Sequence, residues 1–297
     1  MDKTNHGFLI LDKPLGMTSR AAVDCCAQWF PLWTRLGHTG TLDPLATGVL
    51  VVAVGQGTRL THYVQSMTKT YRAGIRLGAR SDTDDGEGNI TVDEGAGSLP
   101  LAEVQGALSS FVGVIPQVPP AFSAAKLEGR RAYDLARRGA TVDLAARPVR
   151  IDAIELVRYD YPGLSIDVHC GKGTYIRSLA RDLGERLGCG AYLTSLRRTS
   201  VGPFHESAAL PLIVDPDVGR RSLVDLSLAL GDLPRVTVTD ADAERLVHGQ
   251  TLAWAGAEAS GEVAIFNSAG TLVGAGAIEE HQRLRPKKMF WRNPGQA

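Results

Sequence analysis

The chain has 297 residues, of which 44% are hydrophobic and 22% are charged, enough for one large domain with a sizeable core and one small domain. Its 32 Lys and Arg residues balance 32 Asp and Glu residues, which argues against non-specific coating of nucleic acid but permits RNA binding through local basic surfaces. The start of the chain has no long apolar stretch, and the longest apolar run, 49–54, is too short to cross a bilayer. We therefore expect a cytoplasmic protein with no membrane partner, in which the four cysteines are buried, reduced thiols.

The first part of the chain predicts short strands separated by loops. Apolar and β-branched runs indicate strands at 8–11, 48–54 and 69–77, and a helix through 21–29 with Ser19 as its N-cap. Residues 36–47 are rich in Gly, Thr and Pro, so we expect no regular element there. An acidic loop at 81–88 follows the third strand.

The rest of the chain mixes further helices and strands. We expect helices at 131–138 and 174–187, strands at 164–170 and 192–201, and a leucine-rich helical segment at 222–230. After about residue 233 the pattern predicts a strand at 236–238, a short helix at 242–248 and a hairpin over 261–278 that turns at 267–270. Because strands and helices do not alternate regularly, a doubly wound parallel sheet is disfavoured.

The loop Gly37–Gly48, GHTGTLDPLATG, carries the most informative chemistry. It presents Asp43 rigidly, between glycines and a following proline and just before a buried strand, as loops with catalytic groups often do. The structural alternative is an aspartate that makes an Asx-type turn. The loop nevertheless resembles the catalytic motif of the bacterial tRNA pseudouridine-55 synthases, which contains that family's essential aspartate. Four more segments are similar to the family in the same order: 12–19, 69–78, 117–139 and 171–185.

This resemblance implies an isomerase that needs no cofactor and no metal and has tRNA as its partner. The family cleaves the C1′–N1 bond of a flipped-out uridine in the TΨC loop (position 55), turns the base and rejoins it through C5. The implied fold is α+β: a mixed, largely antiparallel sheet with flanking helices and a central cleft in residues 1–232, and a small β-rich, PUA-like RNA-binding domain in 233–297. We expect a monomer.

The resemblance also implies roles for individual residues. Asp43 is the essential carboxylate, Arg177 pairs with it, and Tyr71 stacks on the target base and assists proton transfer. Four residues are expected to bind the substrate or shape the cleft: Lys13, His38, Tyr175 and Leu196. Each has a structural alternative, since most strand tyrosines and leucines are core residues and most arginines, and histidines in loops, lie at the surface.

Two basic clusters suit contacts to RNA phosphates, although either also fits an ordinary solvated face. They comprise Lys126, Arg130, Arg131, Arg137, Arg138, Arg147 and Arg150, and near the C-terminus Arg283, Arg285, Lys287, Lys288 and Arg292. A second hypothesis is a tRNA-binding folding chaperone with secondary catalysis. A third and weaker one is a nucleotide-dependent enzyme, because Gly55-Gln-Gly57 begins like a dinucleotide motif but Leu60 replaces the third glycine.

Overall fold

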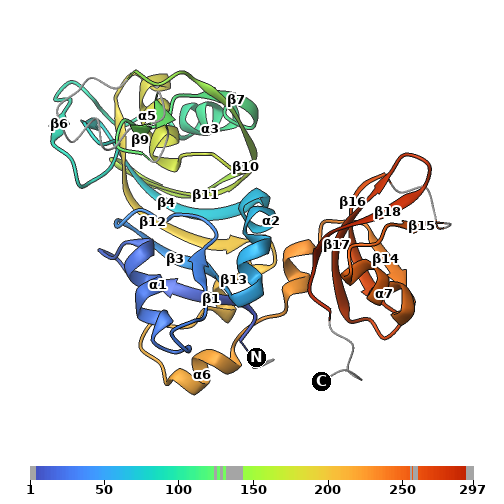
Figure 1. The fold of residues 1–297 in the computed structure, drawn as a ribbon. Coiled ribbons are helices and arrows are strands. Elements are labelled where there is room, and N and C mark those ends of the chain that lie inside the picture. Colours follow the sequence, from blue (N-terminus) through green and yellow to red (C-terminus); the bar gives the residue numbers. More distant parts are fainter. Residues whose placement is uncertain are drawn as a thin grey trace.

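The chain folds into a nine-stranded sheet and a five-stranded sheet (Figure 1). A computed structural model describes residues 5–123, 126–127, 130–131, 143–254, 256 and 260–291. The large sheet has the order β1-β3-β12-β4-β11-β10-β7, with β2 paired to β3 and β13 paired to β12. Its strands are β1 (Gly7–Lys13), β2 (Leu36–His38), β3 (Ala46–Val54), β4 (Lys69–Leu77), β7 (Gly113–Gln117), β10 (Arg147–Asp160), β11 (Gly163–Cys170), β12 (Ala191–Val201) and β13 (Phe204–His205).

The pairing in this sheet is largely antiparallel. The exception among the described strands is β12 with β3, which run parallel. Residues 49–54 of β3 are fully buried, because both faces of this central strand are covered. In β4, buried residues alternate with more exposed ones, so Lys69 and Tyr71 share a face with core residues such as Ile75. The predicted mixed, largely antiparallel sheet is confirmed.

Helices flank the large sheet. They are α1 (Ser19–Ala27), α2 (Thr61–Ser66), α3 (Leu101–Ser109) and α5 (Ile176–Arg186), with α6 (Pro216–Arg221) in the connection to the C-terminal part. The helix α5 packs closely on β12, since a Cβ on Gly184 would overlap the backbone of Ala191. None of the described helices is both long and apolar enough to span a membrane.

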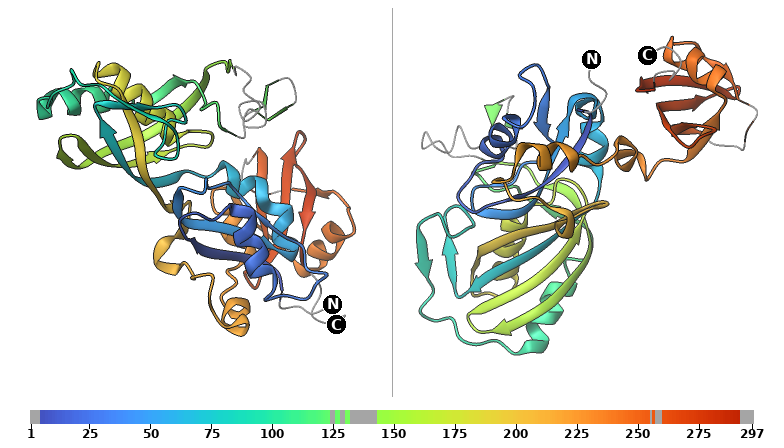
Figure 2. Two further views of the ribbon diagram at one scale, coloured as in Figure 1. Left: turned by 90° about the vertical axis from the view of Figure 1, so that its left-hand side faces the viewer. Right: turned by 90° about the horizontal axis from the view of Figure 1, so that it is seen from below.

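The C-terminal part forms its own sheet, in the order β14-β16-β17-β18-β15. Its elements are β14 (Arg235–Val238), α7 (Asp240–Val247), β15 (Leu252–Ala253), β16 (Gly261–Asn267), β17 (Leu272–Glu279) and β18 (Arg283–Met289). The hairpin turn at 267–270 is confirmed, with Gly270 in the left-handed region at φ 78°. Figures 1 and 2 show this sheet beyond the connecting segment 206–234. It contacts the α2 region of the larger part, and Ala264 and Phe266 share a core cluster with Tyr63 and Val64. The boundary at 232/233 stays a prediction.

Several predicted elements are confirmed, and others need correction. The strands expected at 8–11, 48–54, 69–77, 164–170 and 192–201 lie within β1, β3, β4, β11 and β12, and α5 lies within the predicted helix 174–187. The prediction that 36–47 has no regular element was wrong, because Leu36–His38 gains backbone partners from β3 and Ala46 already belongs to that strand. At 222–230, the short 3-10 helix η3 covers only Leu226–Leu230.

The N-cap prediction for the first helix was also wrong. Thr18 is the N-cap, and its side chain accepts from the Ala21 amide, whereas Ser19 is the first helical residue. The helix ends at Ala27 rather than at residue 29. The helix predicted at 131–138 lies outside the described residues, apart from Arg131, which is placed in the short strand β9 (Arg130–Arg131). Between residues 79 and 160, the strands β5 (Ala79–Ser81), β6 (Ile90–Val92), β7, β8 (Lys126–Leu127) and β10 were also not predicted.

Candidate active site

A cavity of about 290 Å³ lies where the loop 37–48 meets the large sheet. Its size is at the lower end of the range for small-ligand pockets, about 300–1,000 Å³. Its walls come from segments that are distant in sequence. They are residues 39–43 and 46 of the loop, Gln65, Lys69 and Tyr71, Ser123, residues 171–177, and Leu196 and Arg198.

The loop that carries Asp43 is fixed at several points. The Ser19 hydroxyl accepts from the Leu42 amide at 2.8 Å and donates to the Leu42 carbonyl at 2.9 Å. The Ala46 amide donates to the Asp43 carbonyl at 3.0 Å. Gly48 closes the loop at φ +93°, and a Cβ there would overlap the backbone of the neighbouring strand β12. These anchors hold the Asp43 side chain at the edge of the cavity.

Arg177 connects Asp43 to a second carboxylate. Its guanidinium lies 2.8 Å from Asp43 Oδ2 and 3.2 Å from Asp85 Oδ2. It also donates to the carbonyls of Phe122 at 2.9 Å and Thr83 at 3.2 Å. The side chains of Arg177 and Asp85 are 6% and 4% exposed, while that of Asp43 is 43% exposed. The guanidinium is therefore fixed from several sides, and the Asp43 carboxylate remains accessible to a molecule in the cavity.

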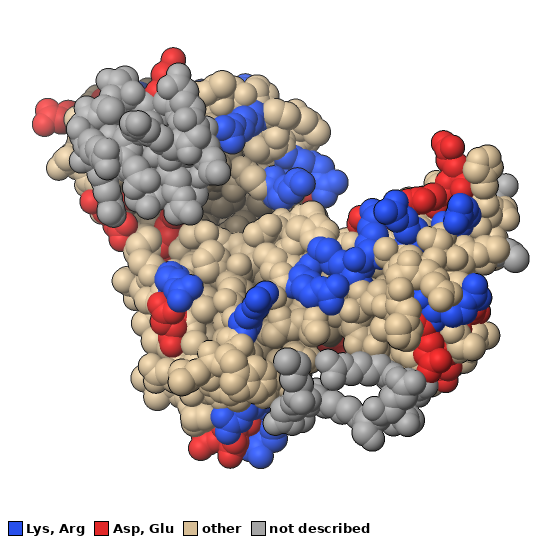
Figure 3. Space-filling model, in the orientation of Figure 1, with Lys and Arg blue, Asp and Glu red and all other residues tan. Residues whose placement is uncertain are grey.

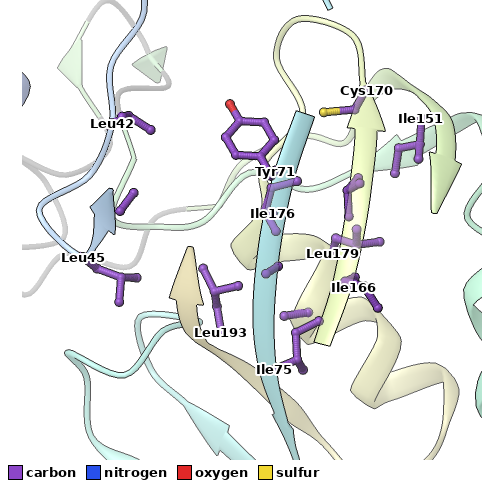
Figure 4. Close-up of a cluster of buried hydrophobic side chains, with 14 of the residues drawn as sticks. Leu42, Leu45, Tyr71, Ile75, Ile151, Ile166, Cys170, Ile176, Leu179 and Leu193 are labelled. Atoms are coloured by element: carbon purple, nitrogen blue, oxygen red, sulfur yellow. The ribbon is translucent and has the colours of Figure 1, made fainter. Parts of the chain in front are cut away.

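Tyr71 lies at the boundary between the cavity and the core. Figure 4 shows its hydroxyl pointing away from Ile75 and toward the loop that carries Leu42. Burial raises the pKa of Tyr71, while the positive charge of Arg198 and a hydrogen bond with it oppose the increase. The ring offers an apolar face to the cavity, and the hydroxyl offers a proton-transfer group.

Tyr175 and Leu196 also line the cavity, as the sequence predicted. Tyr175 precedes α5, and its backbone is held on both sides by Gln117. The Tyr175 amide donates to Gln117 Oε1 at 2.8 Å, and Gln117 Nε2 donates to the Tyr175 carbonyl at 3.1 Å. Leu196 lies opposite Ala46 and Ala73 in the sheet and forms part of an apolar wall.

Lys13 and His38 are not among the described residues that line the cavity. The Lys13 ammonium is fully buried and donates to the carbonyls of Pro14 at 2.8 Å, Met17 at 2.6 Å and Pro44 at 3.4 Å. Burial lowers the pKa of Lys13 to about 8. These contacts tie the segment 14–17 to the loop next to Asp43. His38 lies on β2, its buried Nδ1 has no hydrogen-bond partner among the residues that the structure describes, and burial lowers its pKa. The substrate-binding roles of both residues stay predictions.

Three residues at or near the cavity were missed from the sequence. They are Asp85, Lys69 and Arg198, all buried. The Lys69 ammonium donates to the carbonyls of Gln65 and Met67, and burial lowers its pKa to about 8. The period of two in β4 was a usable signal for Lys69, since it puts this residue on the same face as Tyr71. The acidic run at 81–88 contains Asp85, but nothing in that run singles out one carboxylate.

Solved structures with the same fold define the class of this protein. The chain is similar to "Crystal Structure of a Cbf5-Nop10-Gar1 Complex", with a TM-score of 0.72 and 25% identity, over 97% of this chain and 84% of that one. It is also similar to "Structure of H/ACA RNP bound to a substrate RNA containing 2'-deoxyuridine", with a TM-score of 0.74 and 25% identity, over 97% of this chain and 86% of that one. The fold is that of pseudouridine synthases.

Sequence relatives narrow this class to one family. Three family models match in succession: "TruB family pseudouridylate synthase (N terminal domain)" at 31–176, "tRNA pseudouridylate synthase B C-terminal domain" at 177–213 and "Pseudouridine synthase II TruB, C-terminal" at 234–290. The tRNA pseudouridine synthase B of Rhodopseudomonas palustris is 44% identical, over 96% of this chain and 81% of the relative. The tRNA pseudouridine synthase B of Synechococcus sp. is 41% identical, over 96% of this chain and 97% of the relative. The chain belongs to the TruB family of pseudouridylate synthases, as its motifs predicted.

Proposed function

We propose that this chain converts the uridine at position 55, in the TΨC loop of tRNA, to pseudouridine, with Asp43 as the essential carboxylate. The observation that carries the proposal is the Asp43–Arg177 pair, in which a buried guanidinium holds an accessible carboxylate at the cavity. Relatives that carry the name tRNA pseudouridine synthase B support tRNA as the substrate.

The chemistry needs few groups beyond those that line the cavity. The C1′–N1 bond breaks, a C1′–C5 bond forms, one proton leaves C5 and one proton reaches N1, so no electrons are exchanged with an outside partner. Asp43 acts at the sugar, and Tyr71 stacks on the base and moves a proton. Tyr175 and Leu196 hold the everted base in place. Everting a stacked base costs a few kcal/mol, which stacking and pocket contacts offset.

The RNA-binding surface extends over both sheets in this proposal. Figure 3 shows Lys and Arg side chains gathered where the C-terminal sheet meets the large one. Arg59 and Lys288 lie at this junction, with the Lys288 ammonium donating to the Arg59 carbonyl. Of the first basic cluster, the structure describes the side chains of Arg147 and Arg150, both exposed. Exposed Lys and Arg side chains of this kind suit contacts to RNA phosphates.

Three further expectations belong to this proposal. We expect the enzyme to act as a monomer. It works in the cytoplasm, where its tRNA substrate is found. Residues 1–232 carry catalysis and 233–297 assist RNA binding, a division supported by the separate five-stranded sheet and by the family model that starts at residue 234.

The test is to incubate the purified full chain with an unmodified tRNA transcript, without added cofactor, and to map pseudouridine by position. We expect product at position 55, and a rate at least about 10⁴-fold lower for Asp43→Asn, as for the loss of an essential catalytic group. Asp24→Asn is the matched control, because Asp24 lies on the exposed surface of α1, where it pairs with Arg20. If product persists in Asp43→Asn, the role of Asp43 is refuted. If the wild type binds and refolds tRNA without turnover, the chaperone hypothesis replaces the proposal.

A further inference from the structure

Arg198 occupies a central position in the large sheet. In the antiparallel pair β12–β4 it lies directly opposite Tyr71, and in the parallel pair β12–β3 it lies opposite Gly48. Side chains that are directly opposite in a sheet share one face. One residue therefore has Tyr71 on one side and the end of the Asp43 loop on the other.

The contacts of Arg198 follow from this position. Its residue surface is 2% exposed, and its Nε donates to the Val49 carbonyl at 2.7 Å. A terminal nitrogen lies 3.5 Å from the Gly40 carbonyl, at the start of the same loop. Its positive charge is also the largest charge effect on the Tyr71 hydroxyl, and it favours the phenolate. The guanidinium thus links both ends of the loop that presents Asp43 to the tyrosine that faces the cavity.

Unlike the nearby arginines Arg177 and Arg197, Arg198 has no carboxylate in the described part of the chain to neutralise its charge. Arg177 and Arg197 each have two carboxylate partners, whereas Arg198 forms no ion pair with any carboxylate in the described part of the chain. Keeping an unpaired guanidinium buried is costly, so its contacts to neutral oxygens need a reason beyond stability. The ionisable groups that affect Tyr71 are Arg198 of β12, Cys170 of β11 and Asp43 of the loop, and Arg198 acts against Asp43 by favouring the phenolate.

We propose that Arg198 is a positioning residue, which holds the Tyr71 hydroxyl and the Asp43 loop in the arrangement that the isomerisation requires. The inference rests on the proposed function. During the reaction one proton must reach N1 and another must leave C5. A Tyr71 hydroxyl that gives its proton to N1 and then takes one from C5 completes both transfers and returns to its starting form. Arg198 stabilises the phenolate that exists between them.

The experiment compares three variants of the full chain. Arg198→Met removes the charge, Arg198→Lys keeps it with fewer donors, and Arg197→Met is the control. Arg197 is the next residue on the same strand, but it pairs with Asp12 and Glu206 and does not line the cavity. Single-turnover rates on an unmodified tRNA transcript are measured as a function of pH, at enzyme concentrations that saturate binding.

Arg198→Met should lower the rate about 100-fold, the scale of one proton-transfer group, and should move the alkaline fall of the rate toward higher pH, because the Tyr71 hydroxyl that gives the first proton then ionises at higher pH. Arg198→Lys should keep the wild-type pH dependence at a reduced rate, and Arg197→Met should stay within about threefold of the wild type. In a Tyr71→Phe background, Arg198→Met should cause little further loss, because the two residues act as one unit. An unchanged pH profile in Arg198→Met, or losses that multiply in the double variant, would overturn the proposal.

A second measurement does not depend on turnover. The ultraviolet phenolate band of Tyr71 is obtained by subtracting the alkaline titration of Tyr71→Phe from that of the wild type, and the subtraction is repeated with Arg198→Lys and Arg198→Met as parents. The Tyr71 transition should move to higher pH when the charge is removed and should stay in place when lysine retains it. Absence of a shift in Arg198→Met refutes the inference even if pseudouridine forms. A wild type that makes no pseudouridine refutes the proposed function instead.

Discussion

Replacing Asp85 with Asn tests whether the second carboxylate on Arg177 stabilises the site. Asp85 Oδ2 faces the Arg177 guanidinium at 3.2 Å, while Oδ1 accepts from the Thr83 hydroxyl at 2.6 Å and from the Glu87 amide at 3.1 Å. An Asn amide has one oxygen and one NH₂ group, so either orientation places a donor against a donor. The substitution must therefore lose at least one good interaction and the charge together.

The expected loss in the free energy of unfolding is below the cost of an unpaired buried charge. Leaving a buried charge with no partner costs about 3–5 kcal/mol. In Asp85→Asn the guanidinium keeps Asp43, so the loss should be closer to that of one hydrogen bond to a charged group, about 2 kcal/mol. The less constrained guanidinium should also hold Asp43 less firmly, and we expect the turnover rate to fall about tenfold, since small errors in placement are costly.

Equilibrium unfolding in urea measures the change in stability, and turnover is measured well below the unfolding transition. Asp84→Asn is the control, because Asp84 is in the same loop at φ 62°, a conformation that Asn tolerates well, and its pair with Arg181 is more exposed. The control should lose less than about 1 kcal/mol. Equal losses in both variants, or full activity in Asp85→Asn, would show that the second carboxylate has no special role.

Three further predictions concern charge and backbone conformation. Burial lowers the pKa of Lys69 to about 8, so between about pH 8 and 10.5 the folded state binds fewer protons than the unfolded chain. The stability of the wild type relative to Lys69→Met, measured by urea unfolding, should therefore rise by about 2–3 kcal/mol over that pH range. A difference in stability that does not change with pH would contradict the buried charge. Gly48→Ala should lower the free energy of unfolding by about 3 kcal/mol, because a Cβ there would overlap the backbone of β12. Gly106→Ala is the control: Gly106 lies in the middle of α3 with open space around it, so this change should raise the free energy of unfolding by about 0.5–1 kcal/mol. Similar thermal midpoints for the two variants would contradict the close approach at Gly48. Replacing Arg147 and Arg150 together with Gln should reduce the salt dependence of tRNA affinity by a slope of up to about 2, while an unchanged slope would remove them from the phosphate contacts.

The sequence was sufficient for the elements whose pattern is local. The β-branched run 48–54 and the alternating run 69–77 become buried strands, and the helical period after residue 174 becomes α5. Leu36–His38 could not be recognised, because Gly and a short length disfavour a strand until β3 supplies its hydrogen bonds. Local propensity cannot report a partner that lies elsewhere in the chain.

For the site too, residues with a local sequence signal were predicted, and residues that depend on distant contacts were missed. The motif placed Asp43, Tyr71, Tyr175 and Leu196 around one cavity, with Arg177 bound to Asp43. Asp85 was not found, because its importance comes from a contact 92 residues away. Lys69 and Arg198 are residue types that are usually exposed, so burial was the wrong expectation for them without the pairing of β4 and β12.

The way Arg177 gathers its partners has a consequence for folding. Its guanidinium meets segments that are 55 and 92 residues distant, besides the loop of Asp43. Contacts of such long sequence separation are slow to form, because the chain must close large loops before they are gained. The Asp43 carboxylate acquires its orientation only when all these segments have docked. We therefore expect a chain in which these segments have not docked to lack the proposed activity, so that turnover would report that this site is assembled.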